Sequence, residues 1–203
     1  MSVTLYVTLG ATESTKMVHT SRTPVMTMSS ALIVVLMNRY LSALMDTSLS
    51  LLEVHKAMYF MQESGQPLRL RFSKAPYGPY AENLRHVLSA VEGHFIIGYG
   101  DGGDAPNKPL MPKVEMIEMA EKMAGSDTSV AERVDRVSDL ITRFATPYGM
   151  ELASTVHWVA RHENASTVQE AVHAVYDWNE RKRMFAEAHI HRTWDTLHCQ
   201  GWL

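Results

Sequence analysis

The sequence has little that would suit a secreted or membrane-bound protein. It contains one cysteine, Cys199, so no disulfide can form within the chain. The longest apolar run, residues 31–37, is far shorter than the roughly 20 residues that a membrane-spanning helix needs. Residues 1–10 are apolar but lack the basic start and long apolar stretch of a signal peptide, so we expect none. A reducing compartment fits these features, and we expect a cytoplasmic protein.

An excess of positive charge is also lacking. The formal net charge is −3 over 203 residues, with the ten histidines counted as neutral. This balance excludes a globally basic nucleic-acid binder, although it leaves room for a local basic patch. Hydrophobic residues make up 46% of the chain and charged residues 20%, as in ordinary globular domains, so the chain can bury a sizeable core.

The usual signatures of catalysis and metal binding are absent. The glycine-rich tract 98–104 (GYGDGGD) is not followed by an apolar helix or by Lys-Ser/Thr, so it does not match a phosphate-binding loop. His157 and His162 are five residues apart and do not share a helical face. Cys199 and its neighbour His198 point in different directions on a helix. We therefore predict no metal, no cofactor and no catalytic residue, and we expect that the chain is not an enzyme.

Apolar residues recur mostly at helical spacing. A strand is expected at 3–9 and a polar linker at 10–23, so that residues 1–23 precede one domain at 24–203. Within that domain, Leu68, Leu70 and Phe72 alternate with basic residues and predict a strand, and 95–97 predicts another. The expected helices lie at about 29–45, 51–64, 80–91, 116–125, 129–144, 152–159, 168–175 and 185–200. The fold class predicted is mainly α (α+β), a helical domain with a small β element after the second helix.

Several helix starts carry capping pairs. Ser50 with Glu53, Ser129 with Glu132, and Ser166 with Gln169 each have the spacing at which side chains satisfy the first free amides of a helix. The basic run 180–183 (ERKR) is expected to be the solvated start of a helix.

Two segments combine charge with aromatic rings. The basic residues Arg69, Arg71, Lys74 and Arg85 surround Tyr77 and Tyr80. In the loop 98–104, Asp101 and Asp104 could stand in for phosphates while Tyr99 offers a stacking face. The alternatives are a solvated strand face with core tyrosines, and a plain surface loop.

One tract carries a family resemblance. Residues 51–104, with HK followed by YF, then YGPYAENLRH and GYGDGGD, resemble the C-terminal domain of the DarG antitoxins, as do TPYGMELASTVHWV at 146–159 and the closing GWL at 201–203. A more distant similarity links the chain to the Panacea domain. In the DarG family an N-terminal macrodomain removes ADP-ribose from DNA thymidines, and the C-terminal domain binds and blocks the DarT ADP-ribosyltransferase. That macrodomain is not expected here, and residues 1–23 are a candidate remnant of it.

The resemblance implies an antitoxin domain that inhibits DarT by occupying its single-stranded DNA groove, as a mimic of DNA. Its expected partner is DarT, with nucleic acid as a less favoured partner and no membrane contact. The candidate toxin-binding residues are Arg69, Arg71, Lys74, Tyr77, Tyr80, Arg85, Tyr99, Asp101 and Asp104. Two alternatives stay open, a nucleic-acid-binding regulatory module and an enzyme that acts on ADP-ribose.

Overall fold

A computed structural model of the chain describes residues 24–100 and 102–203. The strand expected at 3–9, the linker expected at 10–23 and the candidate residue Asp101 lie outside these described residues.

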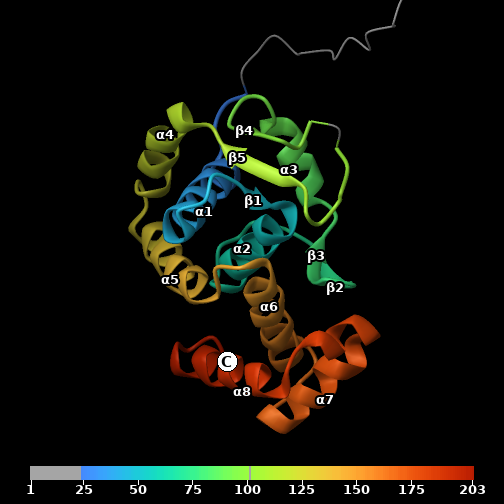
Figure 1. The fold of residues 1–203 in the computed structure, drawn as a ribbon. Helices are drawn as coiled ribbons and strands as arrows, with labels where there is room; N and C mark the ends of the chain where they lie inside the picture. The colour runs from blue at the N-terminus through green and yellow to red at the C-terminus, as the bar shows by residue number, and fades with distance from the viewer. Residues whose placement is uncertain (1–23, 101) are drawn as a thin grey trace, which may run out of the picture.

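The described residues are mainly helical, as the sequence predicted. Their eight α-helices are α1 (Met28–Leu44), α2 (Leu51–Glu63), α3 (Leu84–Val91), α4 (Val114–Ala124), α5 (Thr128–Phe144), α6 (Pro147–His162), α7 (Val168–Trp178) and α8 (Glu187–Cys199). A short 3₁₀ helix, η1 (Glu180–Met184), joins α7 to α8. In Figure 1, α6 runs from the upper group of elements down to α7 and α8 at the C-terminal end.

The β structure is small and antiparallel. Strands β1 (Leu49–Ser50), β5 (Pro109–Pro112) and β4 (Ile96–Ile97) form one sheet in that order. Strands β2 (Phe72–Ala75) and β3 (Gly78–Ala81) form a separate hairpin after α2. This arrangement confirms the predicted fold class, a mainly helical domain with a small β element after the second helix.

Side chains cap the starts of the helices α2, α5 and α7, although not always those of the expected residues. Ser50 and Glu53 form the predicted capping box at α2. The cap of α5 is Asp127 rather than Ser129, and the cap of α7 is Thr167 rather than Ser166. Adjacent polar residues compete for the same amides, so spacing alone locates a cap only to within one or two residues.

The strand expected at 68–72 begins later, at Phe72. Arg69 has a left-handed backbone conformation, with φ of 58°, which breaks an extended strand. The amide side chain of Gln62 then takes the place of a partner strand, because it donates to the carbonyl oxygen of Leu70 and accepts from its N–H at 3.0 and 2.8 Å. The alternating residues before Phe72 thus belong to a segment that is hydrogen-bonded to the side chain of Gln62 on α2, and not to a strand of a sheet.

Tertiary pairing also shortens two expected helices. The helix expected from Tyr80 starts at Leu84, because Tyr80 pairs with Ser73 in the hairpin. The last helix starts at Glu187 rather than near Phe185, because 180–184 forms η1 instead.

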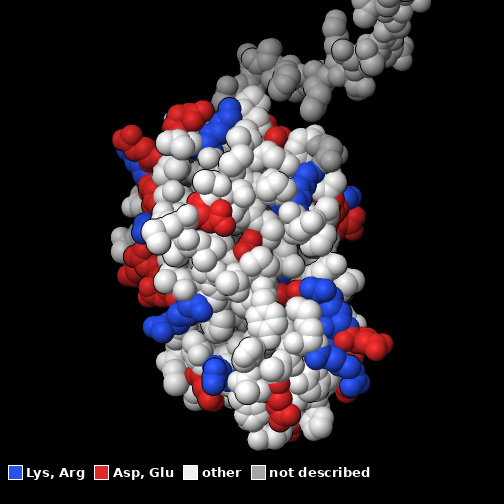
Figure 2. Space-filling model, viewed as in Figure 1, with Lys and Arg blue, Asp and Glu red and all other residues white. Residues whose placement is uncertain are grey.

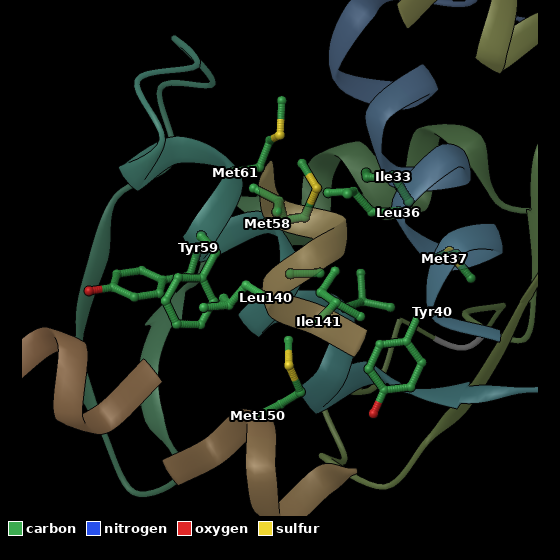
Figure 3. Close-up of a cluster of buried hydrophobic side chains, with 14 of the residues drawn as sticks. Ile33, Leu36, Met37, Tyr40, Met58, Tyr59, Met61, Leu140, Ile141 and Met150 are labelled. Carbon is green, nitrogen blue, oxygen red and sulfur yellow. The ribbon is translucent and has the colours of Figure 1, made fainter. Parts of the chain in front are cut away.

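The core is organised around α1 and α2. Residues 31–37 of α1 are all buried, and this helix packs against α4, α5 and α2. Figure 3 shows the cluster, in which Ile33 and Leu36 of α1 lie near Met58 of α2 and Leu140 and Ile141 of α5. Each fully buried large aliphatic side chain contributes about 1.5–3 kcal/mol. The apolar run of α1 is therefore explained by burial of this helix on several sides, against α2, α4 and α5.

None of the helices in residues 24–100 and 102–203 combines the length and apolar character needed to cross a membrane.

Gly98, which directly follows β4, lies very close to strand β5 of the same three-stranded sheet. Its φ is +112°, and an added Cβ would overlap the carbonyl oxygen of Pro109. Gly98→Ala should lower the free energy of unfolding by about 1–3 kcal/mol or more, measured by urea titration. Gly93→Ala is the control, because its φ is +72° but nothing lies within 4 Å of the added Cβ. Equal losses in the two variants would show that backbone strain alone matters at Gly98.

Candidate functional site

Helix α2 supplies one wall of the candidate site. Leu51, Leu52, His55 and Lys56 follow helical spacing and therefore share a face, and all four are buried. A histidine and a lysine within such an apolar helix are unusual, because burying a charge is costly unless a partner compensates for it.

The β2–β3 hairpin forms the facing wall. Its turn consists of Pro76 and Tyr77, since Ala75 pairs with Gly78. Gly78 has φ of +94°, and an added Cβ would lie 3.0 Å from Thr155 Oγ1 on α6 and 3.4 Å from Lys56 Nζ. Only a residue without a side chain lets the hairpin lie this close to both helices.

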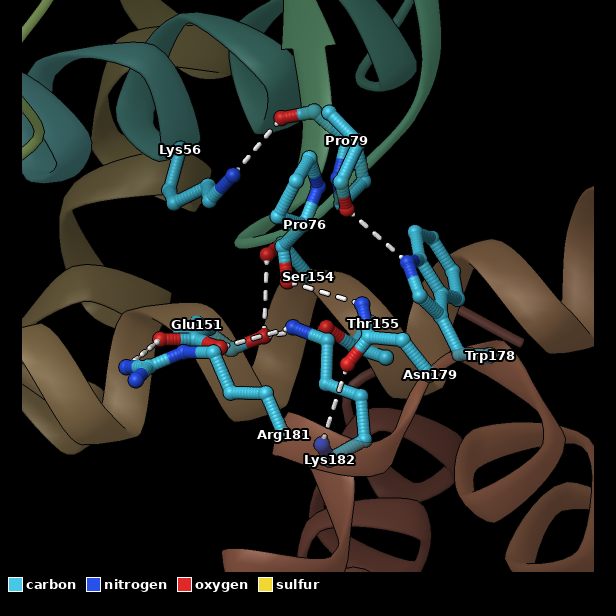
Figure 4. Close-up of polar contacts among 11 residues, drawn as sticks. Lys56, Pro76, Pro79, Glu151, Ser154, Thr155, Trp178, Asn179, Arg181 and Lys182 are labelled. Atoms are coloured by element: carbon cyan, nitrogen blue, oxygen red, sulfur yellow. Dashed lines mark hydrogen bonds and ion pairs between the residues drawn. The ribbon is translucent and has the colours of Figure 1, made fainter.

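Hydrogen bonds fix the hairpin from two sides, as Figure 4 shows. Lys56 Nζ donates to the carbonyl oxygen of Pro79 at 2.7 Å. At the end of α7, Trp178 Nε1 donates to the carbonyl oxygen of Ala75 at 2.8 Å. Asn179 Nδ2 donates to that of Pro76 at 3.1 Å. The turn is thus held by segments that lie about 20 and 100 residues away in the chain.

A pocket of about 220 Å³ lies between α2 and the hairpin. It is lined by Leu51, Leu52, His55, Lys56, Ala75, Pro76, Tyr77, Gly78, Tyr80, Asp104 and Pro106. A wider hollow of about 720 Å³ shares Leu52, Tyr77 and Pro106 with it and extends to Tyr148, Glu151, Arg181 and Met184. We call the two adjoining hollows, with these lining residues, the hairpin groove.

His55 is held within the groove as a neutral ring. It stacks on Tyr80 with ring centroids 4.3 Å apart, and only 2% of the residue is exposed. Burial, with a smaller effect from the charge of Lys56, lowers the pKa of His55 from 6.5 to about 3. Its Nδ1 is buried and has no hydrogen-bond partner among the described residues.

A buried ionic cluster lies beneath the groove. Lys182 Nζ and Glu151 Oε1 are 2.7 Å apart, with side-chain exposures of 0% and 2%. Arg181 Nη2 lies 3.2 Å from Glu151 Oε2, and its guanidinium stacks over the ring of Tyr77 at 4.4 Å. Burial lowers the pKa of Lys56 to about 7, to which the charge of Lys182 adds, and burial lowers the pKa of Lys182 itself to about 8. Three basic groups therefore surround one carboxylate.

Asp104 closes the pocket and is paired within the chain. Its Oδ2 accepts from Arg85 Nη2 at 2.6 Å and its Oδ1 from the Tyr99 hydroxyl at 3.2 Å. Burial alone would raise the pKa of Asp104, but the hydrogen bonds from Arg85, Tyr99 and Tyr80 and the charge of Arg85 outweigh it and lower that pKa. Asp104 therefore stays ionised with a cation beside it.

The structure brings together part of the predicted set. Tyr77, Tyr80 and Asp104 line the pocket, while Arg85 and Tyr99 lie behind it as partners of Asp104. Tyr99 is only 1% exposed, so its ring does not offer the stacking face expected of it.

The remaining candidates lie apart or are not described. Arg69 and Arg71 are exposed, and Lys74 pairs with Glu163 at 2.8 Å while its Nζ lies 4.5 Å from the centre of the Trp178 ring. Asp101 is outside the described residues. Contact with a toxin at these positions, and DarT as the partner, stay untested predictions.

The groove also contains residues that sequence reasoning missed, namely His55, Lys56, Glu151 and Arg181, and Lys182 lies buried beneath it. The expectation that 180–183 is solvated is wrong for Lys182, which is fully buried against Glu151. Of these residues, only His55 and Lys56 could have been noticed from the sequence, because they are two basic residues within a mostly apolar helix. Among residues 24–100 and 102–203, no three His, Cys, Asp or Glu side chains are placed to hold a metal ion.

Figure 2 shows charges of both signs on one face. Acidic side chains follow the side of α4 and α5, whereas basic side chains gather on the opposite, lower side near β2 and α7.

Loss of the buried ion pair between Glu151 and Lys182 should lower the free energy of unfolding strongly. Glu151→Gln leaves the buried Lys182 without a negative partner and should cost about 3–5 kcal/mol in urea unfolding. Glu163→Gln is the matched control, because its partner Lys74 is 38% exposed and the pair should contribute less than about 1 kcal/mol. Replacing Glu151 and Lys182 together by Leu and Met should recover most of the loss. Similar stability of Glu151→Gln and wild type would show that Lys182 does not need this carboxylate.

The two buried histidines predict how stability changes with pH. Burial also lowers the pKa of His157 to about 3, so between pH 6.5 and 3 the unfolded chain binds protons that the folded chain does not. The free energy of unfolding should therefore fall as the pH is lowered through this window, by about 1.4 kcal/mol per pH unit for each histidine. His55→Phe should reduce this slope by that amount and change stability little at pH 7, because Nδ1 of His55 has no described partner to lose.

His157→Phe is the comparison variant. Its Nδ1 lies 2.7 Å from the buried Tyr59 hydroxyl, so this variant should reduce the slope equally and also lose about 1–3 kcal/mol at pH 7. Urea titrations between pH 4 and 7 measure both effects. An unchanged slope in His55→Phe would mean that His55 is protonated in the folded chain.

Comparison with known proteins gives a consistent name. A DNA ADP-ribosyl glycohydrolase of Thermus aquaticus is 38% identical over 150 residues, which cover 74% of this chain and 41% of the relative. Proteins of the same name from Mycobacterium tuberculosis and Mycobacterium bovis are each 35% identical over 178 residues, covering 81% of this chain and 51% of the relative. No protein-family model matches the chain. The chain thus spans about half the length of the curated relatives it matches.

These names correct the sequence analysis. They designate an enzyme that removes ADP-ribose, so the assignment to a DarG toxin-binding antitoxin domain is wrong, and so are DarT inhibition by DNA mimicry and the expectation that the chain is not an enzyme. The structure shows why the motifs misled. The YGPY turn is bonded to α2 and α7, and Asp104 of the loop is paired with Arg85, so both tracts have a role in the fold itself.

Proposed function

We propose that this chain acts in the removal of ADP-ribose from DNA, as a DNA ADP-ribosyl glycohydrolase or as a large part of one. The observation that carries the proposal is the similarity to three proteins of that name over 74–81% of the chain. A cytoplasmic setting belongs to the same proposal, because a chain with a single cysteine suits a reducing compartment.

The hairpin groove is the proposed site at which the modified DNA binds. An ADP-ribosyl group combines flat rings with a doubly charged pyrophosphate. The groove offers an apolar pocket beside Arg181, whose planar guanidinium suits phosphate oxygens. Arg181 and Lys182 are two cations against the single carboxylate of Glu151, and the side chain of Arg181 is 42% exposed, so a phosphate anion in the larger hollow can meet the surplus positive charge at Arg181.

The geometry supports binding more directly than bond cleavage. Glycoside hydrolysis ordinarily uses two carboxyl groups, one as acid and one as base or nucleophile. The two carboxylates that line the groove, Glu151 and Asp104, are both paired with cations of the chain. The groove therefore contributes positioning of the substrate, and the assay must establish whether the cleaving groups are also in this chain.

The test uses the full chain and a single-stranded oligonucleotide that carries ADP-ribose. Release of ADP-ribose is followed by chromatography, and binding by fluorescence anisotropy. Arg181→Gln should weaken binding about ten-fold, because it removes charge-assisted hydrogen bonds to phosphate. The matched control is Arg183→Gln, an exposed arginine two residues away that does not line the groove, and it should change binding less than two-fold.

Release by the wild-type chain would place the cleaving groups within it. Binding of modified over unmodified oligonucleotide without release would limit the chain to a substrate-binding part of the enzyme. Absence of both release and preferential binding would contradict the proposal.

A further inference from the structure

We propose that the smaller pocket of the hairpin groove binds a nucleobase, and that His55 forms the hydrogen bond that reads the edge of that base. This inference rests on the proposed function, which supplies the two sources of such a ring, the DNA itself and the adenine of the ADP-ribosyl group.

The size of the pocket suits one ring system. Its volume is about 220 Å³. Pockets that enclose whole drug-sized ligands span about 300–1,000 Å³, so this one suits a base without its sugar and phosphate. The adjoining hollow of about 720 Å³ leaves room for those groups next to Arg181.

The walls suit a flat and largely apolar ligand. Leu51 and Leu52 line one side, and Pro76 of the hairpin turn lines the other. Tyr77 is 37% exposed at the junction with the larger hollow, so its ring is available for stacking as well as for contact with Arg181. A phosphate or a free sugar would gain little from such walls.

His55 supplies the polar group that points to a ligand. Buried polar atoms nearly always have a hydrogen-bond partner, yet Nδ1 of His55 has none among the described residues. His157 is equally buried, and its Nδ1 is bonded to the Tyr59 hydroxyl at 2.7 Å. The difference lies in position, because His55 lines the pocket and His157 does not.

The ring of His55 is suited to reading a base. A neutral imidazole has one N–H donor and one acceptor nitrogen, which matches the mixed donors and acceptors on base edges. Stacking on Tyr80 fixes the plane of the imidazole before a ligand arrives. Asp104 at the pocket edge keeps acceptor capacity for an exocyclic amino group beyond its bonds to Arg85 and Tyr99.

The experiment follows the side-chain nitrogens of His55 by NMR in the full chain labelled with ¹⁵N-histidine. The probes are AMP, ADP-ribose, the four deoxynucleosides and ribose 5-phosphate, which has no base. A base-containing probe should shift the nitrogens of His55 and leave those of His157 unchanged. Shifts with AMP, ADP-ribose and deoxyadenosine but with no other deoxynucleoside would assign the pocket to an adenine, and shifts with thymidine, deoxycytidine or deoxyguanosine would assign it to another base of the DNA.

The variant His55→Phe keeps the ring that stacks on Tyr80 and removes both nitrogens. It should weaken binding of the effective probe about ten-fold, as expected for one lost hydrogen bond, whereas His86→Phe, at an exposed histidine outside the groove, should not. If the His55 variant does not fold, the nitrogen shifts of the wild-type chain decide alone.

Three results would overturn the inference: no shift of His55 with any base, an equal shift with ribose 5-phosphate, or unchanged affinity in a folded His55→Phe. These results are distinct from failure of the proposed function, because base binding is measured without ADP-ribosylated DNA. A chain that binds bases but neither binds nor cleaves the modified oligonucleotide would contradict the function and keep the pocket.

Discussion

The buried ion pair between Glu151 and Lys182 fixes how η1 and the end of α7 lie against α6, next to the hairpin groove. Glu151 lies in the first half of α6 and Lys182 on η1, so their 2.7 Å pair joins the segment that follows α7 to α6. Trp178 and Asn179, just before η1, in turn hold the backbone of the hairpin turn. A hairpin of two four-residue strands is marginal by itself, and here its position is imposed by helices that come much later in the chain.

Burying charge is a poor way to gain stability, because desolvation cancels much of the attraction between the partners. The cluster instead fixes the arrangement of α2, the hairpin, α6 and η1. Lys182 is bonded to Glu151, Lys56 is bonded to Pro79, and Gly78 lets the hairpin approach α2 and α6 closely. An apolar replacement would allow several packings of the turn, whereas directional bonds allow few. The position of the hairpin is thus fixed by hydrogen bonds from α2 and from the end of α7.

Most of the helical fold could be predicted from the sequence, because helices leave local signals. Ser50 and Glu53 mark the start of α2, and the stripe of Val130, Val134 and Val137 predicts α5. The hairpin could not be located in the same way. The alternating segment before it is bonded to the side chain of Gln62, and the register of β2 depends on contacts with α6 and α7.

The site was predicted only in part, for a related reason. Tyr77, Tyr80 and Asp104 are close to one another in sequence and stand out as aromatic or charged residues in a turn and a loop. Glu151 and Lys182 lie 47 and 78 residues beyond Asp104, and each has the sequence context of a solvated helix position. Nothing local shows that they meet. The family resemblance drew on the same conspicuous tracts, and the names of the relatives contradict the function inferred from it.

The arrangement of polar and apolar surface in the groove implies an orientation for any nucleotide that enters it. The smaller pocket has mostly apolar walls. Its one cationic side chain, Lys56, is 2% exposed and bonded to the carbonyl oxygen of Pro79, and Asp104 is ionised at the pocket edge, so the pocket disfavours a phosphate, which would lose its hydration. The larger hollow carries the guanidinium of Arg181 above a cluster with surplus positive charge, so it favours the anion. Tyr77 lies between the two, with Arg181 against its ring. A ligand with a base at one end and phosphates at the other is therefore bound in one direction, with the base toward His55. A ligand that lacks either end loses the interactions of one hollow altogether.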